Sequence, residues 1–169
     1  MALDSSHNIY ACDVGNHCVQ IITPGGVVTR YSNGAPADIM KTPNYPAFDA
    51  EGNLYVSDSG DWKKDNGLIY RIRPGSECEV FTRELTTFPN GICLGPGGDY
   101  LYVVMSLNPP RVDRIKIESN GSAGAIETVV ELPSSVPDGV AFDTSGNLYV
   151  SMYRPDRIYR LTPSNQLDV

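Results

Sequence analysis

Three asparagine or aspartate residues each follow a proline, and their side chains carry the oxygens that hard cations bind. These residues are Asn44, Asn90 and Asp138. Amide carbonyl and carboxylate oxygens are ligands that calcium accepts readily. Neither histidine nor cysteine occupies these positions, which argues against zinc. If the three side chains lie close together, they predict a site for Ca²⁺ or another divalent cation.

An internal repeat sets the spacing of these residues. The segments "HNIYACD", "GNLYVSD", "DYLYVVM" and "GNLYVSM" align at intervals of 45, 47 and 47 residues, from 54 − 9, 101 − 54 and 148 − 101. The aligned positions, called register residues below, are Ile9, Leu54, Leu101 and Leu148. Asn44, Asn90 and Asp138 precede their register residues by 10, 11 and 10 positions. The three residues therefore occupy nearly the same position in their repeats.

Each repeat predicts β-strands separated by turns, four of them in a complete repeat. The alternating apolar and polar residues, rich in Val, Thr, Tyr and Phe, favour strands, and glycines and prolines fall between them. No segment has the periodicity of a capped helix. In the last repeat the strands are expected at 139–143, 148–153 and 157–163, and a fourth strand is expected in the earlier repeats at 27–32, 78–84 and 125–132.

Four antiparallel strands in about 45 residues are typical of a β-propeller blade. The fold class is therefore all-β, and residues 1–169 form a single partial β-propeller domain. Its blade repeats are expected at about 1–40, 41–86, 87–134 and 135–169, about three and a half of an expected six blades. The first strand of each blade lines the central channel, so Asn44, Asn90 and Asp138 are expected to converge there. The same position in the first repeat falls before Met1.

A second interpretation of these three residues stays open. Asn and Asp beside Gly are ordinary turn formers whose side chains cap neighbouring backbone N–H groups. Their recurrence at the same position of the repeat favours a role as cation ligands but is also compatible with a role in turns.

Composition excludes several classes of function. The net charge of −7 argues against nucleic acid as a partner, because binding a phosphate backbone requires concentrated Lys and Arg. No apolar run reaches the roughly 18 residues of a membrane-spanning helix, so no membrane association is expected. No secretory signal is visible in the first residues, which indicates a cytoplasmic protein. The four cysteines lack a C-x-x-C spacing and are expected to be free thiols.

Two segments resemble a known family. "FPNGICLGPGGDYLYV" at 88–103 and "VPDGVAFDTSGNLYVSMYRPDRIYRL" at 136–161 resemble the six-bladed propellers of the senescence-marker-protein, gluconolactonase and luciferin-regenerating-enzyme family. The resemblance extends from about residue 40 to the C-terminus. It implies a calcium-dependent hydrolase of lactones or related esters. By this resemblance Asn90 and Asp138 are metal ligands, Asp138 is also the catalytic residue, and Asn44 binds substrate.

The sequence departs from the family pattern in two places. Tyr45 and Pro46 follow Asn44, where the family usually has an aspartate. Nothing matches the family's remaining metal ligand, a glutamate in its first blade. An alternative is a non-catalytic scaffold that binds a protein partner, because "NIYACDVGNHCVQIITPGG" at 8–26 resembles an NHL-type propeller repeat. A remnant that folds without activity is a third possibility.

Three further expectations concern the surface. Open blade edges would allow self-association, since unpaired strands and apolar faces invite pairing. Trp62, in the long loop at 59–67, either selects substrate at the channel mouth or covers the apolar side of its own loop. His17 is expected to form a hydrogen bond in a turn.

Overall fold

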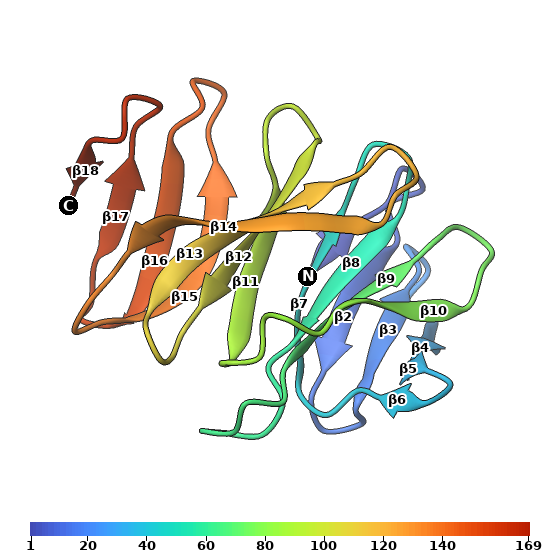
Figure 1. Ribbon diagram of the computed structural model, residues 1–169. Helices are drawn as coiled ribbons and strands as arrows, with labels where there is room; N and C mark the ends of the chain where they lie inside the picture. The colour runs from blue at the N-terminus through green and yellow to red at the C-terminus, as the bar shows by residue number, and fades with distance from the viewer. The chain divides into compact units, whose positions relative to one another are not determined.

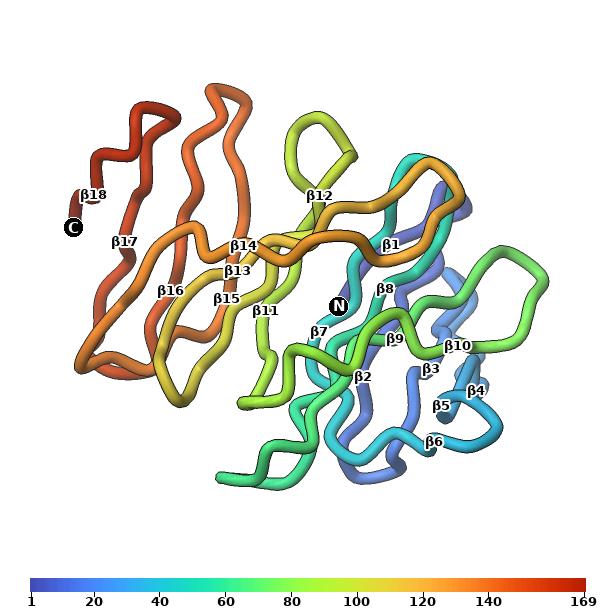
Figure 2. The backbone as a smooth tube through the Cα atoms, in the orientation of Figure 1, coloured from blue at the N-terminus to red at the C-terminus, as the bar shows by residue number.

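The computed structural model describes all of residues 1–169 and contains 18 strands and no helix (Figures 1 and 2). Sixteen of these strands form four antiparallel sheets of four strands, and within each sheet the strands follow one another in chain order. These sheets are the blades predicted from the repeat. No helix has the length and apolar character that crossing a membrane requires.

The chain divides into two compact units, Met1–Pro89 and Asn90–Val169. The first unit holds two blades and a two-stranded sheet. Its strands are β1 (Ala2–Leu3), β2 (Ile9–Asp13), β3 (Cys18–Ile22), β4 (Val28–Ser32), β5 (Gly34–Ala35), β6 (Asp38–Ile39), β7 (Pro43–Phe48), β8 (Leu54–Asp58), β9 (Leu68–Ile72) and β10 (Cys78–Thr82).

The second unit holds the other two blades. Its strands are β11 (Pro89–Leu94), which begins one residue before the boundary, β12 (Tyr100–Met105), β13 (Arg111–Ile117), β14 (Ala123–Glu131), β15 (Val136–Phe142), β16 (Leu148–Arg154), β17 (Ile158–Leu161) and β18 (Leu167–Asp168).

An aspartate side chain organises the turn between the first two strands of a blade. Asp143 Oδ1 accepts hydrogen bonds from the backbone N–H groups of Ser145 and Asn147, each at 2.9 Å. Its Oδ2 accepts from Asn147 Nδ2 at 2.8 Å and from the Tyr149 hydroxyl at 3.2 Å. The Asn147 side chain is the main reason that the pKa of Asp143 lies below its usual value. Asp4 makes the corresponding contacts in the first blade. These turns are therefore set by local side chains.

Each unit has its own apolar core, built from alternate residues of its strands. In the first unit the core includes Tyr10, Val19, Leu54, Val56 and Tyr70. In the second unit it includes Val104, Val112, Leu148, Val150 and Leu161. The register residues Leu54, Leu101 and Leu148 are at most 2% exposed, so the column on which the repeats align lies in the core in the last three repeats, whereas Ile9 is half-buried. Burial of such side chains is the main stabilising contribution to each unit.

The observed strands differ from the predicted ones at their starts. The strand predicted at 139–143 begins earlier, at Val136, and Pro137 and Asp138 lie inside β15 because Pro137 still pairs with Met152. The short strands β5 and β6 were not predicted, since two residues cannot show an alternating pattern. All four cysteines are free thiols, as expected.

Candidate functional site

The predicted site residues lie near the starts of the first strands of three blades. Asn44 is the second residue of β7, Asn90 the second of β11, and Asp138 the third of β15. The strand pairing shifts between Pro43 and Tyr45 around Asn44, and between Pro137 and Val140 around Asp138. Such β-bulges redirect a side chain out of the regular alternation of the strand. Asn44 and Asp138 are therefore held in bulges.

A hydrogen-bonded serine orients the Asn90 amide. Asn90 Nδ2 donates to Ser106 Oγ at 3.2 Å, and Ser106 Oγ donates to the Pro137 carbonyl oxygen at 2.6 Å. A carbonyl oxygen only accepts, so the serine hydrogen is committed to Pro137 and the serine oxygen must accept from the amide. The Asn90 nitrogen Nδ2 therefore faces Ser106, and its carbonyl oxygen Oδ1 lies on the other side of the amide.

The same arrangement surrounds Asn44 in the first unit. Asn44 Nδ2 donates to Ser59 Oγ at 3.0 Å, and Ser59 Oγ donates to the Pro89 carbonyl at 2.8 Å. Both serines stand five positions after their register residues, 59 − 54 and 106 − 101. Ser59 and Ser106 are buried, so water does not compete for these bonds. Both asparagine amides therefore have a defined orientation.

Asp138 has different surroundings. Tyr153 occupies the serine position of its blade, since 153 − 148 is also five. The Asp138 side chain is exposed, and its carboxylate makes no hydrogen bond or ion pair. Its bulge is held through the backbone instead, because Gly139 N donates to Ser151 Oγ at 2.9 Å. No Lys, Arg or His side chain forms an ion pair with this carboxylate.

Asn90 and Asp138 belong to strand ends that approach each other closely within the second unit. A Cβ atom placed on Gly91 would lie 2.5 Å from the Asp138 carbonyl oxygen and 2.7 Å from Gly139 Cα. Only glycine allows the backbones of β11 and β15 to come this near. The structure therefore places Asn90 and Asp138 on two closely spaced strand starts. Asn44 occupies the equivalent strand position in the first unit.

The oxygen donors of Asn90 and Asp138 fit a hard divalent cation. One offers a neutral amide carbonyl and the other a carboxylate, and calcium takes both kinds of ligand. The chain contains no group of three or more His, Cys, Asp and Glu side chains that could hold a metal ion. A cation at this position would therefore need additional ligands of another kind, such as backbone carbonyls or water.

Sequence reasoning missed the orienting serines. Ser59 and Ser106 share one column of the repeat, and this recurrence was the available signal. His17 was expected in a turn hydrogen bond, and its Nδ1 is bonded with the Lys41 carbonyl at 2.5 Å. Trp62 is 57% exposed and packs edge-to-face on Phe88, with ring centroids 5.0 Å apart.

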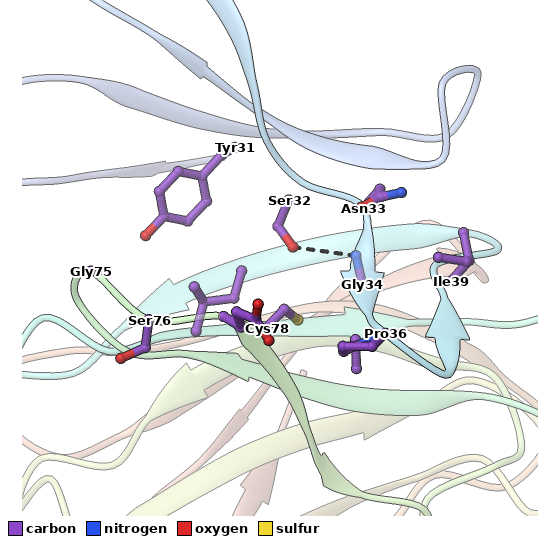
Figure 3. Close-up of a pocket in the computed structure, with 12 residues that line it drawn as sticks. Tyr31, Ser32, Asn33, Gly34, Pro36, Ile39, Gly75, Ser76 and Cys78 are labelled. Atoms are coloured by element: carbon purple, nitrogen blue, oxygen red, sulfur yellow. Dashed lines mark hydrogen bonds between the residues drawn. The ribbon is translucent and has the colours of Figure 1, made fainter.

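A separate cavity of about 370 Å³ lies in the first unit, bordered by Tyr31, Ser32, Gly34 and Cys78 (Figure 3). Ser32 Oγ accepts a hydrogen bond from Gly34 N at 3.2 Å. Burial raises the pKa of the Cys78 thiol to about 11, so it stays protonated at neutral pH and is a poor nucleophile. The cavity contains none of the three predicted site residues and offers no pair of groups arranged for catalysis.

The chain matches a known protein family. The family model described as the SMP-30/Gluconolactonase/LRE-like region matches residues 31–169. Strictosidine synthase-like protein 3 of Arabidopsis thaliana is 25% identical over 160 residues, covering 86% of this chain and 40% of that protein. Lactonase drp35 of Staphylococcus haemolyticus is 27% identical over 116 residues, covering 66% of this chain and 35% of that protein. The chain thus spans 40% or less of the length of these two relatives.

Solved structures confirm the fold. A gluconolactonase from Xanthomonas campestris superposes with a TM-score of 0.86 at 18% identity, covering 98% of this chain and 59% of that one. A calcium-binding protein, regucalcin, from Agrobacterium tumefaciens superposes with a TM-score of 0.77 at 16% identity, covering 99% of this chain and 57% of that one. The predicted β-propeller architecture is therefore confirmed.

Proposed function

Because the chain belongs to the SMP-30/gluconolactonase/LRE-like family, we propose that the protein hydrolyses lactones or related esters with the help of a bound calcium ion. The observation that carries this proposal is the Asn90–Ser106–Pro137 hydrogen-bond chain beside the exposed Asp138 carboxylate. In this proposal it orients the neutral oxygen ligand, and Asp138 on the neighbouring strand start supplies the charged one.

Asn90 and Asp138 would hold the cation. The orientation of the Asn90 amide is set before a cation arrives, so little side-chain entropy is lost on binding. Asp138 supplies the negative charge, and no protein cation neutralises it. Asn44 is proposed to bind the substrate, and Ser59 holds its amide in one orientation. A bound divalent cation supplies Lewis acidity toward the substrate carbonyl.

Asp138 is also proposed as the proton-transfer group. In lactone hydrolysis a water oxygen bonds to the carbonyl carbon and the bond between that carbon and the ring oxygen breaks, which yields a hydroxy acid. The Asp138 carboxylate accepts a proton from the attacking water and delivers it to the ring oxygen as that bond breaks. Its exposure leaves room for both water and substrate.

The names of three similar proteins are consistent with this chemistry. One relative is named a lactonase, and the Xanthomonas structure is described as a gluconolactonase. The Agrobacterium structure is described as a calcium-binding protein. These descriptions support the substrate class and the cation as proposals for this chain.

The first test is calorimetric titration of metal-stripped protein with Ca²⁺ at a stated salt concentration. The parent protein is expected to bind, and Asp138→Ala is expected to weaken binding on the order of 100-fold because the site loses its only charge. Asp99→Ala is the matched control, since it removes an exposed carboxylate in the turn after β11. Lactone hydrolysis should fall in the same variant that loses calcium.

Two results would contradict the proposal. Equal Ca²⁺ affinity in the parent and in Asp138→Ala would show that Asp138 is not a calcium ligand. Absence of Ca²⁺ binding in the parent would favour the non-catalytic scaffold predicted from residues 8–26.

A further inference from the structure

Each blade has two faces that carry alternate residues of its strands. The register residue lies on one face, and the residue that follows it points to the other, because successive side chains of a strand alternate. The following residue is a tyrosine in all four blades: Tyr10, Tyr55, Tyr102 and Tyr149. We call the two sides the register face and the tyrosine face of a blade.

Within each unit, the tyrosine face of one blade packs on the register face of the next blade. In the first unit the ring of Tyr10 meets that of Phe48 edge-to-face, with centroids 4.9 Å apart. In the second unit Tyr102 meets Phe142 in the same way, at 4.8 Å. Each phenylalanine pairs directly with the register residue of its own blade, so both lie on register faces. The chain therefore repeats one kind of contact between blades.

The first blade has an open register face. One directly paired residue from each of its strands forms an apolar row on this face: Leu3, Ile9, Ile22 and Val28. Leu3 is 63% exposed and Val28 is 52% exposed, and no residue of the row belongs to the core of the first unit. The corresponding row of the second blade is also apolar and forms part of that core: Phe48, Leu54, Ile72 and Cys78. The first blade thus exposes a row that the second blade buries.

The last blade has an open tyrosine face. Ile158 lies on this face and is 58% exposed. Its counterpart in the third blade, Val112, is fully buried in the core of the second unit. Each of the two pairs with the residue three positions after its register residue, so they occupy the same place in their blades. Arg160, also on this face, forms an ion pair with Asp168 at 2.7 Å, which balances its charge within the blade.

The ring of Tyr149 is held in the same way as the ring of Tyr10. The hydroxyl groups of Tyr149 and Tyr10 donate to Oδ2 of Asp143 and Asp4 respectively, each at 3.2 Å. Tyr10 packs on Phe48 while it makes this hydrogen bond. Tyr149 is therefore already oriented for the contact that Tyr10 makes, so little side-chain entropy would be lost on docking.

We propose that the tyrosine face of the last blade docks on the register face of the first blade of a second copy of this chain. Each chain carries one open face of each kind, and both units already contain the contact of a tyrosine face with a register face. Leu3 occupies the position of Phe48 and Phe142, since it pairs with the register residue of its blade. Tyr149 of one copy therefore meets Leu3 of the other.

The proposed contact is head-to-tail, because the two faces that meet are different. Docking removes the exposed apolar row of the first blade from water, which favours association. The next row of the same face contains Gln20 and Arg30, which pair across β3 and β4, so this face is more polar than the faces buried inside the units. Obligate interfaces are more hydrophobic than this one, so the association is expected to be reversible and to depend on concentration.

Sedimentation velocity of the parent protein from about 1 to 100 μM should show faster sedimentation as the concentration rises. Val28→Glu places a charge on the register face, and Ile158→Glu places one on the tyrosine face. Each variant alone should remain monomeric, because burial of an unpaired charge opposes docking. An equimolar mixture of the two variants should form a dimer, since each supplies the intact face that the other lacks. Both positions are exposed, so the variants should fold, and far-UV circular dichroism checks this.

Val14→Glu is the matched control, because it places the same charge on an exposed apolar residue in the turn between β2 and β3. It should associate like the parent. A parent protein that stays monomeric at every concentration would overturn the proposal. Association of either face variant alone would also overturn it, since like faces would then be pairing, and so would a mixture that fails to associate. These outcomes do not depend on whether the protein binds calcium or hydrolyses lactones.

Discussion

The starts of β11 and β15 carry nearly the same motif, Pro-Asn-Gly and Pro-Asp-Gly, but their polar side chains are held differently. Asn90 is 7% exposed and bonded to Ser106, whereas Asp138 is exposed and has Tyr153 in the serine position. An amide has an oxygen at one end only, so a ligand asparagine needs a partner that selects its orientation. A carboxylate has two equivalent oxygens and needs none. The difference indicates that the serine is required by the amide rather than by the strand.

The largest difference between the two strand starts is expected for Asn90→Asp. The new carboxylate would face Ser106 Oγ, whose hydrogen is used by the Pro137 carbonyl, so one buried acceptor would lose its donor. We expect a loss of about 3 kcal/mol in the free energy of unfolding. Denaturant titration measures this loss. Asp138→Asn, the reverse swap at an exposed position, should change stability by less than about 0.5 kcal/mol. Equal costs for both swaps would contradict the comparison.

Gly91→Ala tests the close approach of the two strands. The added Cβ would meet the backbone of Asp138 and Gly139, which cannot move aside as a flexible side chain can. We expect destabilisation by about 2 kcal/mol, seen as a lower midpoint of thermal unfolding. Gly97→Ala serves as the control, because a Cβ there meets nothing within 4 Å. A Gly91→Ala protein as stable as this control would show that the strands do not approach closely.

Ser106→Ala is expected to have a smaller effect, on Ca²⁺ affinity. The Asn90 amide would lose the partner that selects its orientation, while Asp138 would keep its side-chain environment. We expect Ca²⁺ affinity to fall about tenfold, as is typical when a group that orients a metal ligand is removed. Calorimetry measures the affinity, and Ser145→Ala at the opposite end of β15 is the control. Unchanged affinity would argue that the asparagine does not need the serine.

The smallest effect is expected at the far ends of the same strands. Asp143 organises the β15–β16 turn, whereas Gly95 occupies the corresponding place in the β11–β12 turn. Hydrogen bonding, chiefly from the Asn147 side chain, holds the pKa of Asp143 below its usual 3.8. Because the folded pKa is depressed, the stabilisation is present above about pH 4 and is lost as the pH falls through the folded pKa.

Asp143→Asn should therefore lower the thermal unfolding midpoint at pH 6 and lower it less at pH 2. Thermal unfolding of both proteins at the two pH values gives the comparison. An equal difference at both values would show that the charge of Asp143 contributes nothing to the turn.

The repeat predicted the blades because its signals are local. Alternation, turn residues and the column of register residues all act within a few positions along the chain. Leu54, Leu101 and Leu148 are indeed almost fully buried. The predicted strand starts were wrong at Asp138 because a bulge depends on pairing with another strand, which a turn motif does not reveal. The calcium site and the catalytic role of Asp138 remain predictions.

The four-stranded blades and the repeat position shared by Asn44, Asn90 and Asp138 therefore follow from local sequence patterns. How these side chains are held depends on contacts between segments that are distant in the chain. Ser106 lies 16 residues from Asn90 and 31 from Pro137, and Trp62 meets Phe88 across 88 − 62, or 26, positions. Contacts over such separations depend on how strands and loops are placed in space. For this reason, neither the orientation of the amides nor the aromatic pair was visible in the sequence.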